Sequence, residues 1–348
     1  MKTDKKIEVY EELTRQRFIA LFSFLIACTF TFIIDISVGP SFLSIYDVFS
    51  AIFSPNSCDH TTRIIVWSIR LPIALMAIVV GAALGLAGAL MQTILNNPLA
   101  SPYTLGVSAG AGFGAALAIV LGVGVIPWAE EYLVPINAFF FAMIATLLVF
   151  FISKTKGVTT ESMILTGIAV MFLFNSLLAL LEYIASEQAL QAIVFWLFGS
   201  LLKTTWTKLG ITSLVLLLIT LLLTIDVWKL TALRMGDEIA KSLGVDVKKL
   251  RLKVFIYISL LTAVAVCFVG TIGFIGLVAP HIARILVGED QRFLIPMSLL
   301  AGAFLLSTSS IISKLIIPGS IFPIGIVTSF IGVPFFLYLI LRKRKRYW

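Results

Sequence analysis

The histidines and cysteines are the residues of this sequence that could bind a metal or act as nucleophile, acid or base. The 348 residues include two histidines, His60 and His281, and three cysteines, Cys28, Cys58 and Cys267. A zinc site needs three or four clustered nitrogen or sulfur ligands, and a Ser-His-Asp triad needs a histidine beside a serine. The histidines lie far apart in the chain, and the odd cysteine count argues against a disulfide framework. The sequence therefore predicts no catalytic residue and no metal site.

The sequence also lacks the usual features by which a transport protein supplies its own energy. The chain has no G-x-x-x-x-G-K-[ST] loop, so we expect it neither to bind ATP nor to need another cofactor. Asp35, Glu182 and Asp226 fall near the ends of apolar segments, whereas ion-coupled carriers place charges at mid-membrane, where each costs about 3 kcal/mol or more. If this chain pumps a solute, another protein is expected to supply the energy.

The composition identifies the environment in which these residues lie. The chain is 59% hydrophobic and 13% charged, with a mean hydropathy of +1.06, which predicts an integral membrane protein. The apolar runs are long and do not alternate, so we expect an all-α bundle and a single domain, 1–348. Ten spans are predicted: 17–36, 70–92, 104–126, 136–153, 162–184, 209–228, 254–270, 273–287, 294–313 and 323–341.

Positive charge predicts the orientation of these spans. With both termini cytoplasmic, 21 of the 26 lysines and arginines fall on the cytoplasmic side. The remaining five, on the outer side, are Arg63, Arg70, Lys203, Lys208 and Lys314. We interpret the basic tail "RKRKRYW" as an anchor to anionic lipid and not as a nucleic-acid contact.

Three interruptions of the apolar pattern contain proline, glycine or polar residues: "NNPLASPY" at 96–103, "KTKGVTTES" at 154–162 and "GFIGLVAPHIAR" at 273–284. At membrane depth, backbone leaves helical geometry only where protein or a water-filled cavity satisfies it. Each is either a kinked structural span or part of a transport pathway. The small-residue runs at 81–90 and 106–117 predict closely packed helices.

The largest cytoplasmic loop, 229–251, is charged and has a helical period, with Leu233, Ile239, Ala240, Leu243 and Val247 on one side. Its glycines predict two short helices on the membrane face. The loop is either a solvated connection or a docking surface for a soluble partner. A further helix is predicted at the outer interface within 185–206.

Several long blocks, including "GALMQTILNNPLASPYTLGVSAGAGFGAAL", "ALRMGDEIAKSLGV" and "GTIGFIGLVAPHIARILVGEDQRFLIP", resemble the FecCD-type permeases of bacterial ABC importers for iron(III) siderophores, haem or cobalamin. The resemblance runs from about residue 60 to the C-terminus. It implies a ten-helix type II importer permease of the bacterial cytoplasmic (inner) membrane, paired with a second permease subunit as homodimer or heterodimer. Its expected partners are two cytoplasmic ATPase subunits, which bind the ATP, and an extracytoplasmic substrate-binding protein.

The resemblance also implies roles for individual residues. Residues 231–250 match the pair of coupling helices that contact the ATPase, with motif positions Gly236, Asp237, Glu238, Ala240 and Gly244. Thr160 and Glu161 match the cytoplasmic gate, where the family commonly has two small hydroxyl residues. Glu161 either adds negative charge at the exit or points to solvent.

On the outer side, Arg70 and Lys314 match positions that dock the binding protein, while a second basic position is occupied by Ile73. His281 and Arg284 match the cytoplasmic end of a short eighth helix, and haem or iron ligation by His281 is the alternative. The sequence thus predicts the permease of an ATP-driven importer, with a ferric siderophore as the expected cargo and alternating access as the mechanism. Haem or cobalamin import, or an ATP-independent secondary carrier, are the alternatives.

Overall fold

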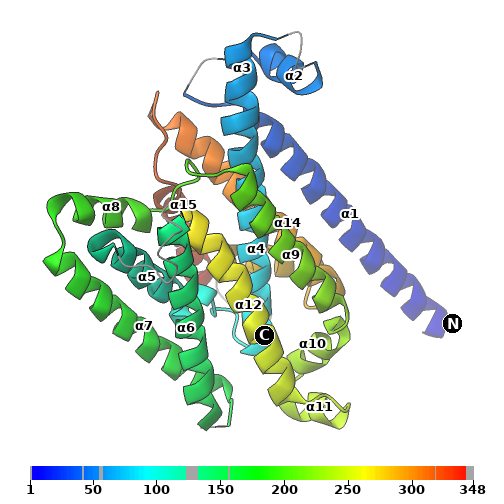
Figure 1. Ribbon diagram of the computed structural model, residues 1–348. Helices are drawn as coiled ribbons and strands as arrows, with labels where there is room; N and C mark the ends of the chain where they lie inside the picture. Colours follow the sequence, from blue (N-terminus) through cyan, green and yellow to red (C-terminus); the bar gives the residue numbers. More distant parts are fainter. Residues whose placement is uncertain are drawn as a thin grey trace.

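The computed structural model describes residues 2–40, 43–54, 58–122, 132–155, 157–317 and 319–341, and all regular elements among these residues are helices (Figure 1). The basic tail predicted at 342–346 lies outside the described residues. The all-α prediction is confirmed.

Ten apolar helices correspond to the ten predicted spans. Seven are long enough to cross a membrane: Tyr10–Ser37 within α1 (Lys2–Ser37), His60–Ile94, α6 (Leu133–Thr155), α7 (Thr160–Ile184), α9 (Trp206–Thr224), α12 (Val247–Val269) and α14 (Gln291–Leu315). Three are shorter: α5 (Val107–Leu121), α13 (Ile275–Val287) and α15 (Ile324–Leu341). The span His60–Ile94 is a continuous helix made of α3 (His60–Ile64), a π-helical segment η1 (Ile65–Arg70) and α4 (Leu71–Ile94).

The remaining elements are short. They are α2 (Ile45–Phe53), the 3-10 turn η2 (Pro102–Leu105), α8 (Glu187–Leu197), α10 (Val227–Arg234) and α11 (Asp237–Ser242). The helix predicted within 185–206 is therefore α8.

Some predicted boundaries were wrong in an instructive way. The span predicted from 254 begins at Val247, and the span predicted from 17 belongs to a helix that begins at Lys2. In both cases charged residues extend the helix beyond its apolar part, because backbone hydrogen bonding does not require apolar side chains. A third boundary was predicted too late in the chain. The span predicted to end at 126 ends at Leu121, because Gly122 adopts a left-handed conformation with φ 62°.

The core is built around α4, which packs closely against α12, α13 and α14. A Cβ added at Gly88 would overlap the carbonyl oxygen of Gly276 in α13, and one added at Gly81 would overlap that of Gly302 in α14. These glycines let the helix backbones approach each other, which is how helices associate in lipid. The prediction of close packing from the small-residue run at 81–90 is confirmed.

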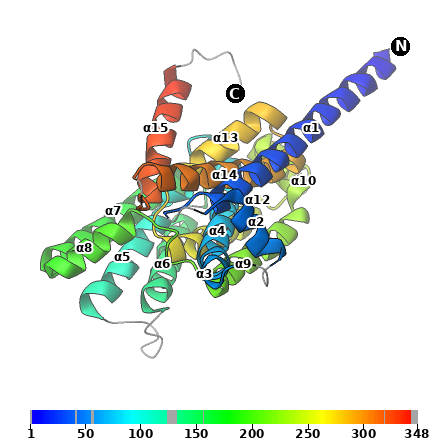
Figure 2. The same ribbon diagram turned by 90° about the horizontal axis from the view of Figure 1, so that it is seen from above.

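The two ends of the bundle carry different elements. The start of α1, the connection between α6 and α7, and the helices α10 and α11 lie at one end, while α2, α3 and α8 lie at the other (Figure 1). Segments predicted to be cytoplasmic thus share one end. The N-terminal part of α1 extends away from the other helices in both views (Figures 1 and 2).

Candidate functional site

The predicted pair of short helices is present in the 229–251 loop, and glycines separate its parts. Gly236, with φ 113°, lies between α10 and α11, and Gly244, with φ 82°, follows α11. Both conformations belong to the left-handed region that favours glycine. Asp246 then caps α12 by accepting a hydrogen bond from the Lys249 amide at 3.1 Å. That bond and the hydrogen bond from the Lys249 side chain lower the pKa of Asp246. We call residues 231–250 the coupling segment.

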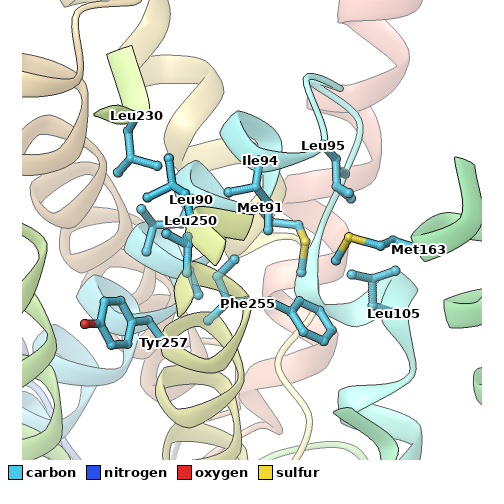
Figure 3. Packing of buried hydrophobic residues seen from close by; sticks show 14 of the residues in the cluster. Leu90, Met91, Ile94, Leu95, Leu105, Met163, Leu230, Leu250, Phe255 and Tyr257 are labelled. Carbon is cyan, nitrogen blue, oxygen red and sulfur yellow. The ribbon is translucent and has the colours of Figure 1, made fainter. Parts of the chain in front are cut away.

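Apolar contacts attach the coupling segment to the bundle. Leu230, Leu233 and Ala240 are buried in one cluster with the ends of α4 and α12 and with residues beside the start of α7. Figure 3 shows members of this cluster, with Leu230 from α10 close to residues of α4 and α12. The helices at this end of the bundle are therefore connected through a common hydrophobic core.

The expected single apolar face of this segment is partly wrong. Leu233, Ala240 and Val247 are buried, but Ile239 is 44% and Leu243 is 54% exposed, as is Met235 at 61%. Ile239 and Leu243 lie four residues apart on the outer side of α11 and its C-cap, whereas Ala240 between them faces the bundle. The outer surface of the segment consequently carries exposed apolar side chains among charged ones.

Arg251, the fifth residue of α12, connects several segments at this end of the molecule. Arg251 is only 5% exposed. Its Nη1 and Nη2 donate to the two carboxylate oxygens of Asp237 at 2.9 and 2.8 Å. Its Nε donates to the Ile94 carbonyl at the end of α4, at 3.0 Å. Bidentate pairing of this kind neutralises a buried guanidinium with defined geometry.

The same guanidinium reaches the predicted gate. Nη2 donates to Thr160 Oγ1 at 3.3 Å and Nη1 donates to the Val158 carbonyl at 3.4 Å. We call residues 157–161 the gate loop. Val158 has φ 56°, a left-handed conformation that costs a β-branched residue about 1–2 kcal/mol. The structure therefore brings Asp237 and Thr160, predicted for two different roles, onto one side chain.

The other predicted gate residue lies differently. Glu161 is exposed in the first turn of α7, as expected if it points to solvent. The turn itself is fixed by Thr159 and Ser162, which cap each other's backbone amides at 3.1 and 3.2 Å. This reciprocal capping satisfies two donors at the start of the helix and sets the direction in which Glu161 leaves it.

A second polar network connects α10 to α13 and α4. Arg234 at the end of α10 donates to both carboxylate oxygens of Glu289, at 2.9 and 3.0 Å, and Arg284 Nε lies 2.8 Å from the same carboxylate. Arg284 also donates to Gln92 in α4 at 3.0 Å. Both short helices, α10 and α11, are thus joined to the membrane-spanning helices by arginine side chains.

Neither arginine contact was predicted, although the sequence contained a signal for one of them. Arg251 falls in the apolar stripe formed by Val247, Leu250, Val254 and Ile258, all of which are buried. A charge inside such a stripe must find a buried partner. For Arg234 and Glu289, the spacing along the chain gave no indication of contact.

Arg70 and Lys314 lie inside the protein in this conformation. Arg70 is 4% exposed and donates to the Ile36 and Ser37 carbonyls at 3.1 and 2.7 Å. Lys314 is 7% exposed and donates to the Asp35 carboxylate at 2.7 Å. Both side chains fix the end of α1, and their assignment to docking stays a prediction. Arg63 and Lys203 are the exposed residues among the five basic ones predicted for the outer side.

The histidines are not gathered into a ligand set among the described residues, where no three His, Cys, Asp or Glu side chains come close enough to hold a metal ion. His281 is half-buried in α13, with its ring 6.0 Å from that of Phe335. Gly276, in the same helix, packs against Gly88. Pro280 lies inside the helix without ending it.

Comparison with known proteins places this geometry in a family. The sequence profile of the FecCD transport family matches residues 26–342. A putative ABC transporter permease of Methanocaldococcus jannaschii is 40% identical over 97% of this chain and 98% of its own length. The hemin transport system permease protein of Yersinia pestis is 36% identical over 81% of this chain and 84% of its own length.

A solved structure gives the same result. An inward-facing conformation of a putative metal-chelate type ABC transporter aligns with a TM-score of 0.80 and 32% identity, over 92% of this chain and 98% of that chain. Together, the helical bundle, the two short helices at one end and these relatives identify the chain as a member of the FecCD transport family, a multi-pass ABC importer permease of the cytoplasmic membrane.

Proposed function

We propose that this chain is the membrane-spanning subunit of an ATP-driven importer that moves an iron(III) siderophore by alternating access. Family membership and the attachment of the coupling segment to the gate loop through Arg251 support this proposal. In this scheme, ATP binding moves the ATPase subunits, the coupling segment follows, and the outer and inner gates exchange.

The coupling segment is the proposed contact with the ATPase. Met235, Ile239 and Leu243 are exposed apolar residues of this segment. Helices α10 and α11 lie at one end of the bundle (Figure 1). Exposed apolar groups rimmed by charge are typical of protein interfaces. Glu238 and Lys241 supply part of that rim and pair at 2.7 Å, and this hydrogen bond lowers the pKa of Glu238. We therefore assign ATPase contact to this surface, with Gly236 and Gly244 setting its shape.

The cytoplasmic gate is proposed to consist of Thr160 and Glu161 with their counterparts in a second permease subunit, homologous or identical. Thr160 begins α7, and α7 leaves large apolar side chains such as Leu165 and Phe172 exposed at 68% and 62%. This surface is suited to lipid or to a second subunit. Glu161 projects from the same end of the helix, where it would face a leaving solute.

Docking of a substrate-binding protein is proposed for the opposite end. The predicted residues Arg70 and Lys314 are buried there, so a direct contact would require their exposure. Arg63 is exposed and lines a surface pocket of about 390 Å³ together with Ile64, Trp67 and Ser68. Basic side chains at this end would steer an acidic partner, as charges at the rim of an interface do.

The cargo is the least constrained part of the proposal. The names of relatives refer to hemin, to iron chelatin, to Fe(3+)-citrate and to vitamin B12. Most of these cargoes contain iron as a chelate, which supports a ferric chelate here. Haem and cobalamin import are the alternatives within the family. Affinity for the chelate would belong to the binding protein.

Uptake into proteoliposomes tests the proposal. The permease is reconstituted with its co-encoded ATPase and binding protein, and ferric siderophores, haem and cobalamin are supplied in parallel. We expect transport of a ferric siderophore only when ATP and all components are present. Transport of haem or cobalamin alone would reassign the cargo, and transport without ATP would establish a secondary carrier instead.

A variant of the coupling segment separates coupling from insertion. Replacing Gly236 by Val and Glu238 by Lys forces a β-branched residue into φ 113° and reverses a surface charge. We expect uptake to be abolished while the protein remains in the membrane. Normal uptake by the double variant would contradict the ATPase contact.

A further inference from the structure

Arg251 is the point at which three separate segments meet. Its guanidinium has five N–H donors, and five acceptors surround it: two oxygens of Asp237, the carbonyls of Ile94 and Val158, and Thr160 Oγ1. The residue is 5% exposed, so water cannot readily replace a lost partner. A displacement of any one segment must therefore break bonds or carry the guanidinium with it.

The partners differ in how firmly they are held. Ile94 ends α4, which is buried on nearly all sides and serves as the fixed reference. Asp237 is the first residue of α11 and its side chain is 40% exposed. Thr160 and Val158 belong to the gate loop. The guanidinium thus connects a surface helix and a loop across a rigid helix end.

The gate loop is strained, so loss of its contact with Arg251 would let the loop relax. Val158 adopts φ 56°, and such a conformation of a β-branched residue persists only when its surroundings fix it. Its amide donates to the Ser153 carbonyl at 3.0 Å, and its own carbonyl accepts from Arg251. If Arg251 follows Asp237 away from the loop, Val158 loses one of these two backbone bonds and can relax.

We propose that Arg251 is the positioning residue that transmits movement of α11 to the gate loop, and that the bond to Asp237 receives that movement. This inference rests on the proposed function, because it assumes that α11 follows the ATPase. Arg234 holds the neighbouring helix α10 through Glu289 but has no bond to the gate loop. The two arginines therefore have separable roles.

Arg251→Gln and Arg251→Lys test the role of the guanidinium. Glutamine removes the charge and most donors, whereas lysine keeps the charge but replaces the planar fork of five donors by three donors on one nitrogen. Lys154→Gln is the matched control, since Lys154 lies in the last turn of α6 at the same end of the bundle, is exposed, and belongs to neither the coupling segment nor the gate loop. Thr160→Val removes one of the two bonds on the gate side and keeps the bond to the Val158 carbonyl.

Two activities are measured on each variant in proteoliposomes: ATP hydrolysis stimulated by the loaded binding protein, and uptake. We expect Arg251→Gln to lower the uptake per ATP hydrolysed about tenfold, with hydrolysis within about twofold of wild type. Arg251→Lys should fall in between, Thr160→Val should lose about threefold, and Lys154→Gln should be unchanged. Equal loss of hydrolysis and uptake, or an unchanged ratio, would show a merely structural role and overturn the inference.

Spin labels give a readout that does not depend on the cargo. Labels at the exposed positions Glu161 and Glu238, in a background without the three native cysteines, report the gate loop and α11 separately. On ATP binding, wild type should change at both positions and Arg251→Gln only at 238. A normal change at 161 in Arg251→Gln would contradict the inference, whereas absence of ATP-driven uptake in wild type would contradict the proposed function instead.

Discussion

The helices α4 and α7 have nearly the same mean hydropathy but occupy opposite environments. Within their most apolar windows, 83% of the His60–Ile94 helix is buried inside the protein, compared with 33% of α7. The difference is side-chain size: α4 carries Gly81, Gly85 and Gly88 against other backbones, while α7 presents leucine and phenylalanine outward. An apolar sequence places a helix in the membrane, and small residues on its surface allow it to pack in the interior of the bundle.

The peripheral helices are held in another way. α1 and α9, like α7, are mostly exposed, with 22% and 28% of their windows buried. Each is fixed at its end by a few polar contacts, such as Asp35 with Lys314 for α1 and Asp226 with Lys253 for α9. Interior helices are thus positioned by shape along their length, and peripheral ones by charge at their ends.

The largest effect is expected from breaking the shape of α4. Gly88→Leu would place a side chain where the Gly276 backbone lies, so the cost should exceed the roughly 3 kcal/mol that overpacking usually causes. Ala169→Leu on the exposed side of α7 is the matched control. Size-exclusion chromatography in detergent should recover the control and not Gly88→Leu; recovery of both would refute the contrast.

Removal of the lysine from the α1 contact comes next. Lys314→Met leaves the fully buried Asp35 without its cation and should destabilise the protein by about 3–5 kcal/mol. The double variant Asp35→Leu with Lys314→Met should recover most of that loss, because no charge is left buried. Thermal unfolding of Lys314→Met, Asp35→Leu and the double variant, each compared with wild type, forms the cycle. Equal loss in Lys314→Met and the double variant would show that packing dominates.

A smaller effect is expected at the end of α9. Burial opposes ionisation of Asp226, but hydrogen bonds from Lys229 and Lys253 at 2.8 and 2.6 Å outweigh it and lower its pKa below 3.8. The stabilisation is therefore complete above pH 3.8 and is lost as pH falls through the lowered pKa.

Asp226→Asn should remove this dependence at a cost of about 1 kcal/mol, because both lysines are partly exposed. Thermal unfolding between pH 3 and pH 7 measures it. If the variant loses as much stability in acid as wild type, groups other than Asp226 cause that loss.

The smallest effect is expected at the N-terminal end of the His60–Ile94 helix, where α3 is exposed. Arg63→Glu reverses an exposed charge in α3 and should weaken binding-protein association by up to about 1 kcal/mol at low salt, with less effect at high salt. Arg70→Gln should instead lower thermal stability, since Arg70 is bonded to the end of α1. Calorimetric binding at two salt concentrations compares the variants, and an unchanged affinity for Arg63→Glu would count against docking there.

Sequence reasoning located the helices because length and apolarity are properties of single segments. It also found the two short helices of the 229–251 loop, because Gly236 and Gly244 interrupt a helical period. It did not find the Arg251 contacts, which join residues 94, 158, 160 and 237 to residue 251. No local pattern specifies which distant groups a buried arginine will meet.

Composition and spacing alone determined that this chain is a multi-span helical membrane protein, with two short helices at its charged end. Tertiary structure decided which helix is central, which basic residues are buried, and that the coupling segment and the gate loop share one guanidinium. The reason is that hydropathy acts on each segment independently, whereas burial of a charge depends on partners that only folding brings within hydrogen-bond distance.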